Sequence, residues 1–360
     1  MSGSDESSTP TSPDDDDLAW LNRHGHNRAQ VNAGIDRAHR SRNLGRVPRS
    51  SRSRRRRRRR KKSRKVHHWY RPRNTVVLPL LVLVLVVAGF LFYVNHELGS
   101  IRRAPLNAAY AGKGSLGTNV LLIASNAPTT AVRADVATMV VQLVHIGTDG
   151  THAALVDVPR DLVLPATADE ARATVGVRYL RSDASGLSTA LQDVFGITIE
   201  HVVQVTYAGY VKASDRLGGV DVSTGPGVEH FSGSQARAYV DEPGITSIEA
   251  GQRNQHWLRG IIEGMFTPGV LFNPFKVIGL LHDFTPSLVI DDAFTTGAMR
   301  SLGWHSRGLS PAQTLYLTVP HKDYVKVSDG VVLQPDLAGM RQLGAAIRAD
   351  NESGIAVFDN

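Results

Sequence analysis

Three groups of charged or polar residues interrupt apolar segments of this 360-residue chain where strands should end or helices begin. They are Arg133 with Asp135, Arg160 with Asp161, and Arg253 with Gln255. Arginine offers a fork of donors that matches phosphate oxygens, a carboxylate can hold Mg²⁺ or Mn²⁺ beside substrate phosphates, and helix N-termini favour anions. Together these groups predict a site for a metal-bound diphosphate. Each group taken alone is equally consistent with a surface salt bridge.

Short apolar segments predict the strands that would position these side chains. They lie at 119–124, 138–146, 153–158, 201–205 and 219–222, with a hairpin turn at 148–150. Near-continuous apolar strands are typical of a sheet that is buried on both faces. Segments with helical spacing of apolar residues, at 186–195, 207–217 and 256–266, would cover it. We therefore predict an α/β fold, a three-layer α/β/α domain with a mixed central sheet. His145, inside an apolar strand, is interpreted as a core histidine.

The apolar segment from Val76 to Val94 contains 19 residues without a charge. As a helix it is long enough to cross the ~30 Å hydrocarbon core of a bilayer. Residues 1–73 hold 21 Lys/Arg against 7 Asp/Glu, a net of +14, whereas residues 74–360 carry a net of −6. Because basic residues stay on the cytoplasmic side, we expect a single-pass cell-membrane protein with a cytoplasmic N-terminus and an extracytoplasmic C-terminal domain. A cleaved signal peptide is the alternative, but no small-residue cleavage site follows Val94.

The predicted organisation follows from these shifts in composition. It consists of a disordered basic cytoplasmic tail at 1–73, a transmembrane helix at 74–95, a stalk at 96–118, the folded domain at 119–350 and a C-terminal tail at 351–360. Without cysteines, the exported domain must depend on its hydrophobic core. The basic tail has three readings: a topology determinant assisted by anionic membrane lipids, a nucleic-acid binder, or a docking site for an acidic partner. Its position before the span favours the first reading, and the acidic exported domain argues against nucleic acid as a partner.

Several motifs in fixed order resemble the LytR-CpsA-Psr family, whose domain is also known as the cell envelope-related transcriptional attenuator. The motifs are Asn119-Val-Leu-Leu-Ile, Arg133-x-Asp135, Val158-Pro-Arg-Asp161, Leu217-Gly-Gly-Val-Asp-Val222, Ser232-Gly-Ser-Gln-Ala-Arg-Ala-Tyr-Val240 and Arg253-Asn-Gln255. The resemblance implies a membrane-anchored phosphotransferase that moves a glycopolymer from a polyprenyl-diphosphate carrier to peptidoglycan or a related wall polymer. It further implies a tunnel for the prenyl chain. Asp135 would bind the metal, Arg160, Arg133, Arg253 and Gln255 would contact phosphate, and Asp161 would assist Arg160.

The chain departs from the family pattern at several positions that would carry charge. Ser125-Asn126 stands where a second metal-binding Asp is usual, and Asp241-Glu242-Pro243 replaces two arginines. Losing one arginine contact to a charged group costs about 1.5 to 3 kcal/mol if nothing compensates. Two hypotheses follow. Either the domain is a transferase in which Arg237, Arg178 or Arg181 compensates, or it is a catalytically weak relative that binds polyprenyl phosphate or wall polymer as a scaffold or regulator of envelope assembly.

Overall fold

The computed structural model describes residues 72–107, 114–126, 138–167, 170–328 and 330–358. The predicted tail as far as residue 71 lies outside these ranges. The segment 127–137, which contains Arg133 and Asp135, lies outside them as well.

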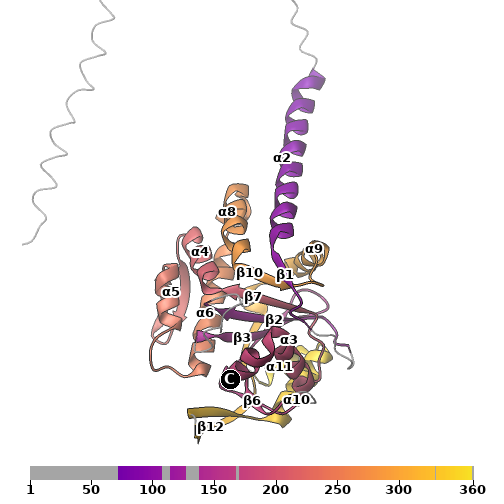
Figure 1. The fold of residues 1–360 in the computed structure, drawn as a ribbon. Helices are drawn as coiled ribbons and strands as arrows, with labels where there is room; N and C mark the ends of the chain where they lie inside the picture. The colour runs from indigo at the N-terminus through magenta and orange to yellow at the C-terminus, as the bar shows by residue number, and fades with distance from the viewer. Residues whose placement is uncertain (1–71, 108–113, 127–137, 168–169, 329, 359–360) are drawn as a thin grey trace, which may run out of the picture. The chain divides into compact units, whose positions relative to one another are not determined.

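A long apolar helix, α2 (Pro72–Ser100), begins the described chain (Figure 1). Its part from Pro79 to Ser100 is long and apolar enough to cross a membrane. At 1.5 Å per residue, 22 residues reach about 33 Å, slightly more than the hydrocarbon core. The side chains from Leu80 to Val87 are between 48% and 62% exposed. Such a continuous apolar surface is stable in lipid but not in water.

A seven-stranded mixed sheet forms the centre of the domain, as predicted. In spatial order its strands are β1 (Arg102–Ala104), β10 (Leu288–Asp291), β7 (His201–Thr206), β2 (Thr118–Ser125), β3 (Val140–Ile146), β4 (Ala153–Val158) and β11 (Thr314–Thr318). The pairs β1–β10, β7–β2 and β4–β11 are parallel, and the other three are antiparallel. All six residues of β4 are buried, in agreement with a sheet covered on both faces.

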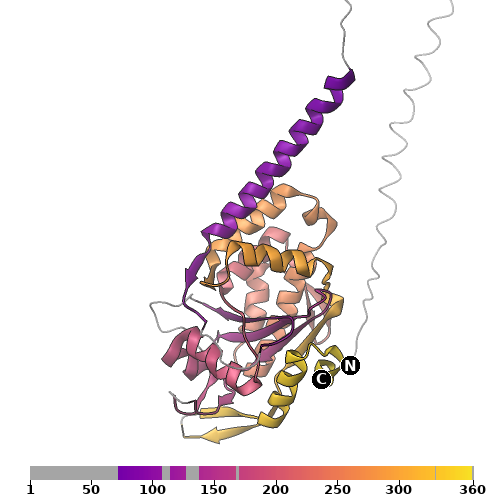
Figure 2. The same ribbon diagram turned by 90° about the vertical axis from the view of Figure 1, so that its right-hand side faces the viewer.

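Two hydrophobic cores lie against the sheet (Figures 1 and 2). The first joins the central strands to α3 (Val175–Phe195), α10 (Leu337–Arg348) and α11 (Glu352–Ala356). The second joins β2 and β7 to α4 (Tyr207–Leu217), α5 (Gly233–Val240), α6 (Ser247–Met265), α7 (Pro268–Leu271) and α8 (Pro274–Phe284). The helix α9 (Thr296–His305) belongs to a third, smaller core with the last turn of α2 and the sheet edge.

Short hairpins and turns complete the domain. The pairs are β5 (Val163–Leu164) with β6 (Ala173–Thr174), β8 (Val220–Thr224) with β9 (Gly227–Phe231), and β12 (His321–Val327) with β13 (Gly330–Pro335). Three 3₁₀ turns lie at Thr285–Ser287, Ser306–Gly308 and Pro311–Gln313.

The folded domain extends beyond both boundaries that we predicted. Within the expected stalk, α2 continues to Ser100 and β1 pairs with β10, because Ile101 and Leu106 are apolar enough to join the cores. Within the expected C-terminal tail, α11 buries Ile355 to 1% exposure. The prediction that Arg253 opens a helix is wrong, since α6 begins six residues earlier at Ser247.

Candidate functional site

The strand register brings the predicted polar strand ends to one edge of the sheet. Ser125 of β2 pairs with Thr206 of β7, Ala124 pairs with Val140, and Val141 pairs with Val158. The ends of β2, β4 and β7 and the start of β3 therefore meet here, and we call this the loop edge. The segment 127–137 follows β2 and precedes β3, so the chain positions of Arg133 and Asp135 fall between two strand ends of this edge.

Arg237 joins the two ends of that segment. It lies on α5, whose start is fixed by a capping box between Ser232 and Gln235. Its Nη2 donates to Asn126 Oδ1 at 3.0 Å, and the amide nitrogen of Asn126 donates to Thr138 Oγ1 at 3.0 Å. Arg237 therefore holds Asn126 and, through it, Thr138, so the residues on both sides of 127–137 are tied to one guanidinium.

Tyr207 lies beneath this guanidinium. The Arg237 carbon is 3.7 Å from the ring centroid, and the phenol donates to the carbonyl of Thr138 at 2.9 Å. Burial raises the pKa of Tyr207, and the charges of Arg237 and Arg160 oppose that rise. The charges of both arginines thus lower the pKa of the same phenol. Arg237 Nη1 is buried without a hydrogen-bond partner among the described residues, so it has a donor available for an anion.

Arg160 lies just beyond β4, where the sequence predicted it. Its side chain is 20% exposed, and its Nε is 3.9 Å from Asp161 Oδ1, too far for a strong ion pair. No hydrogen bond from its guanidinium to the described residues is present in the structure. Of the predicted arginines in the described ranges, Arg160 is therefore the one whose donors are most available.

Arg253, in contrast, is already engaged by the protein. Its Nη1 donates to the carbonyl of Tyr239 at 2.8 Å and to Glu242, and its Nη2 donates to Glu249 at 2.7 Å. Its guanidinium also lies 4.4 Å from the Tyr239 ring centroid. A phosphate would have to displace two carboxylates to reach it.

Gln255 is a structural residue, contrary to its predicted phosphate contact. It is 3% exposed, and its amide donates to the carbonyls of Leu155 and Leu317, both at 3.0 Å. Because it lies within α6 rather than at the helix start, it points at the backbones of β4 and β11. The Thr246-Ser-Ile-Glu249 sequence is a capping-box pattern that could have located the true start of α6.

Two of the three arginines that we considered as compensating cations, Arg178 and Arg181, lie away from the loop edge. Arg178 is 1% exposed and bonds to Glu170 at 2.8 Å and to two carbonyls of the 165–171 loop, so it stabilises that loop. Arg181 is exposed on α3, which belongs to the opposite layer. Arg237 alone of the three lies at the loop edge.

Asp157 forms a buried polar group beneath α6 that the sequence analysis did not single out. It pairs across the strands with Gln142, and both side chains have polar atoms without partners in the described structure. A β-carbon on Gly251 would lie 2.0 Å from Asp157 Oδ2, so only glycine lets α6 approach. Burial raises the pKa of Asp157 well above its usual range, while Arg160 opposes the rise.

An apolar cavity of about 200 Å³ lies in the same layer, beside α8, which contacts α2. Its walls come from α4, α6, α7 and α8, represented by Ala213, Ile261, Val270 and Leu280. All four belong to the core that also contains Tyr207 and its stacked neighbour Trp257. Tyr207, on which Arg237 stacks, and the walls of the apolar cavity therefore belong to one aromatic core.

The described carboxylates of the loop edge do not form a magnesium site by themselves. Asp161 lies beside Arg160, Asp241 accepts from Arg237 at 2.7 Å, and the raised pKa of Asp157 favours its neutral form. Within the described ranges, the one group of at least three potential metal ligands lies elsewhere, at His145, His152 and Asp350. A magnesium ion at the loop edge would thus depend on Asp135.

Comparison with known proteins agrees with this fold. Residues 101–260 match the sequence model of the LytR_cpsA_psr family, in agreement with the resemblance of the motifs. It is 23% identical over 312 residues to the cell wall biosynthesis protein LcpA of Corynebacterium glutamicum, covering 69% of this chain and 59% of that protein. The chain thus spans less than two thirds of this relative's length.

Two solved structures show the same fold. B. subtilis TagV has a TM-score of 0.53 at 15% identity, covering 67% of this chain and 98% of that one. A LytR-Csp2A-Psr enzyme from Actinomyces oris has a TM-score of 0.51 at 18% identity, covering 69% and 97%.

Proposed function

We propose that this protein transfers a glycopolymer from a polyprenyl-diphosphate carrier to peptidoglycan or a related wall polymer. The observation that carries the proposal is the combination of Arg160 and Arg237 at the loop edge with an apolar cavity whose walls belong to the same core as Tyr207. A lipid diphosphate needs both surfaces, cationic donors for its phosphates and an apolar cavity for its prenyl chain. The family match and the similarity to LcpA support a role in the cell wall.

In this proposal, the apolar helix α2 holds the site near the membrane lipids. The cavity helix α8 contacts the last turns of α2, where Glu97 accepts a hydrogen bond from Thr285 at 3.3 Å. Phe272 and Phe275, next to and within α8, are 85% and 81% exposed. With the N-terminus in the cytoplasm, the carrier would enter laterally from the outer leaflet.

In the proposed reaction an acceptor hydroxyl attacks the phosphorus bonded to the sugar, and the lipid phosphate leaves. Arg160 and the free Nη1 of Arg237 would bind the phosphate oxygens and stabilise the charge that develops on them. Asp161 would orient Arg160. Asp135, assisted by Arg133, would hold Mg²⁺ or Mn²⁺, which neutralises phosphate charge when bound.

The transfer of a labelled lipid-diphosphate glycan by the full chain in detergent micelles tests this proposal. Wild type should transfer the label to a wall fragment in the presence of Mg²⁺, and Asp135→Ala and Arg160→Ala should each transfer far less. Equal rates in the three proteins would refute the enzymatic function.

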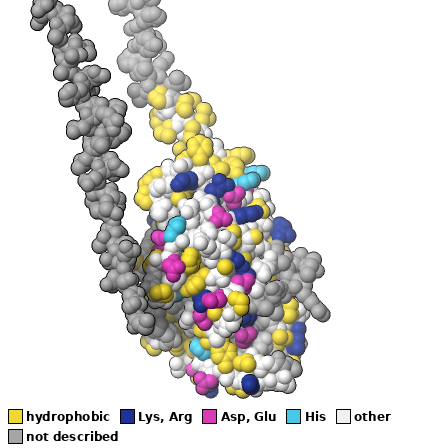
Figure 3. Space-filling model, turned by 90° about the vertical axis from the view of Figure 1, so that its left-hand side faces the viewer, with side chains coloured by type: hydrophobic (Ala, Val, Ile, Leu, Met, Phe, Trp, Pro, Cys, Tyr) yellow, Lys and Arg dark blue, Asp and Glu magenta, His cyan; other side chains and the backbone are white. Residues whose placement is uncertain are grey.

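A second candidate, a binding or regulatory member of the family, is favoured by the charge balance at the loop edge. Arg160, Arg237 and Arg253 face four carboxylates, those of Asp161, Asp241, Glu242 and Glu249. On the side that carries α4 and α5, basic and acidic side chains are interspersed and no continuous basic patch is visible (Figure 3). Saturable binding of the carrier by wild type without any transfer would support this candidate.

A further inference from the structure

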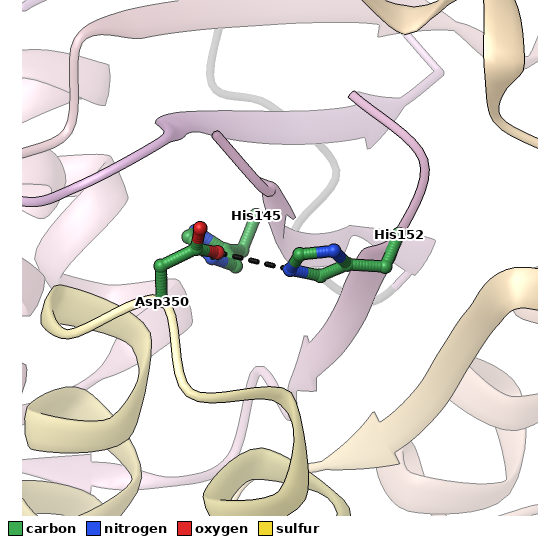
Figure 4. Close-up of side chains that lie close together, drawn as sticks. All are labelled: His145, His152 and Asp350. Carbon is green, nitrogen blue, oxygen red and sulfur yellow. Dashed lines mark hydrogen bonds and ion pairs between the residues drawn. The ribbon is translucent and has the colours of Figure 1, made fainter. Parts of the chain in front are cut away.

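Three potential metal ligands converge at the end of the sheet opposite the loop edge (Figure 4). His145 comes from the end of β3, His152 directly precedes β4, and Asp350 lies between α10 and α11. The Nε2 atoms of both histidines lie 3.0 Å from Asp350 Oδ1. His145 lies seven residues along the strand region from Thr138, roughly 23 Å at the rise of a strand, so this group is separate from the proposed transfer site.

The second nitrogen of each ring faces an oxygen acceptor. His145 Nδ1 is 2.8 Å from Asn119 Oδ1, and the Asn119 amide nitrogen donates to the carbonyl of Thr198 at 2.7 Å, which fixes the amide orientation. His152 Nδ1 is 3.0 Å from a carboxylate oxygen of Asp149. Each Nδ1 atom can therefore donate a hydrogen to that oxygen, as in metal-bound histidines that coordinate through Nε2. In a neutral imidazole the Nε2 atom then has a lone pair and no hydrogen.

Asp350 adds a third electron-rich atom to this point. Its Oδ2 accepts from the backbone nitrogen of Thr148 at 2.9 Å and from the hydroxyl at 2.6 Å. Burial raises the pKa of Asp350, but the hydrogen bonds from Thr148 and the histidines outweigh it and hold that pKa well below its usual range. The carboxylate is thus anionic, and its Oδ1 faces two ring nitrogens.

Two ring nitrogens and a carboxylate oxygen this close need positive charge among them, which protons on Nε2 or a metal ion can supply. A metal ion satisfies all three atoms at once. The hydrogen bonds from Nδ1 to Asn119 and Asp149, and from Thr148 to Oδ2, are the kind of outer partners that orient metal-bound histidines and carboxylates.

We propose that His145 Nε2, His152 Nε2 and Asp350 Oδ1 bind a divalent transition-metal ion of the Zn²⁺ type. Imidazole ligands favour Zn²⁺ over Mg²⁺, which prefers oxygen. Zn–N and Zn–O bonds of ~2.0 to 2.2 Å in tetrahedral geometry separate ligand atoms by about 3.4 Å. Each Nε2 therefore needs to move away from Asp350 Oδ1 by only a few tenths of an ångström, and the ligand atoms all lie within 4.8 Å of one another. His152 is 15% exposed, which leaves a fourth position for water.

The ion would connect parts of the chain that are distant in sequence. It would join the β3–β4 hairpin to the turn between α10 and α11, across 198 and 205 residues. Gly147 permits this arrangement, since a β-carbon there would lie 2.2 Å from the His152 ring. In a chain without cysteines, such an ion would provide the cross-link that a disulfide provides elsewhere.

Zinc titration of the full chain in detergent micelles tests the proposal. His24, His26, His39, His67 and His68 are first replaced by Ser in every protein, so that tail histidines do not contribute. Competition with a chromophoric chelator should show one Zn²⁺ per chain, and the melting temperature should rise with zinc concentration. Asp350→Asn and His152→Gln should each weaken binding more than about 100-fold, and Asp149→Asn, which changes an outer partner, by about 10- to 100-fold.

His230→Gln is the matched control. His230 Nδ1 contacts Asp221 at 2.7 Å, but this exposed pair has no second histidine, so zinc affinity should not change. Asp350→Asn keeps the fold testable, because its amide can donate to an Nε2 lone pair without binding metal. The proposal is overturned if zinc binding is absent, or if it is equal in wild type and Asp350→Asn. Nitrogen NMR of wild type should show zinc-dependent shifts at Nε2 of both His145 and His152; unchanged Nε2 resonances in the presence of zinc would also overturn it.

Discussion

The two ends of the central sheet differ in the charged groups that they offer to a ligand. At the loop edge, Arg237 and Arg253 are cations whose charges are balanced by carboxylates of the same domain. At the hairpin end, two nitrogens of His145 and His152 and the carboxylate of Asp350 converge on one point. At Arg253 and at Arg237 Nη2 an anion must compete with internal carboxylates, whereas the hairpin end offers two nitrogens and an oxygen to a cation. The class of ligand that each end can bind therefore follows from which of its charged and polar groups remain available for a ligand.

The largest expected effect at the loop edge comes from Arg160→Ala. Because the donors of Arg160 are not used by described residues, its loss should remove about 1.5 to 3 kcal/mol of interaction with the phosphate, a 10- to 150-fold drop in transfer rate. Arg181→Ala, an exposed arginine on the other layer, is the control and should transfer normally. A similar drop in both variants would mean that general charge, and not the position of Arg160, determines activity.

The hairpin end should be sensitive to a residue that is not a ligand. Gly147→Ala places a methyl group against the His152 ring and should turn it away from Asp350. Zinc affinity should fall by about 10- to 100-fold, as for other changes that misorient a ligand. Transfer of glycan should remain at the wild-type rate, since the loop edge is unchanged. Unaltered zinc affinity in a folded Gly147→Ala protein would contradict the role of His152.

A smaller effect is expected from the buried carboxyl of Asp157. Its pKa is raised in the folded state, mainly by burial, so folding favours the protonated form. The wild-type domain should lose stability as pH rises above about 4, the usual pKa of an unfolded Asp, until the folded pKa is passed. Asp157→Asn cannot ionise and should gain stability relative to wild type between pH 4 and pH 8. Melting temperatures across this range measure the difference; parallel curves would show that Asp157 does not titrate on folding.

The smallest expected effect tests whether Asp241 competes with the ligand. Asp241→Asn removes a partly exposed pair of the i, i+4 type, worth about 0.3 to 0.5 kcal/mol, and leaves Arg237 Nη2 with Asn126 as its hydrogen-bond partner. Affinity for the lipid carrier should rise about twofold, measured by titration with a fluorescent analogue. Weaker binding would show that Asp241 holds Arg237 in its binding position.

Local sequence patterns were sufficient for the apolar helix and for four of the seven strands of the sheet, β2, β3, β4 and β7, but not for β1, β10 and β11. Near-continuous apolar segments predicted β2, β3 and β4, and the short polar turn at 148–150 predicted their hairpin pairing. These elements depend on neighbours in sequence, as does the apolar helix α2. The start of α6 was missed, although the Thr246–Glu249 capping signal is equally local.

The functional contacts could not be predicted in this way. Arg253 carries a phosphate-binding motif, but its charge is taken up by Glu242 and Glu249, whose side chains face it only in the folded helix. Tyr207 and Arg237 come from separate elements, so their stacking at the loop edge has no signature in the chain. His145 was interpreted as a core histidine; it is indeed buried, but its interior partner is Asp350, 205 residues away.

The sequence by itself determined which segments are apolar, which are charged, and therefore that one apolar helix precedes an α/β domain. These properties follow from composition and periodicity, which act over a few residues. Only the tertiary structure decided which charged groups are left without partners. That balance depends on long-range packing, which paired Arg253 with acids, left Arg160 and one donor of Arg237 available, and placed three electron-rich atoms together at the opposite end of the sheet.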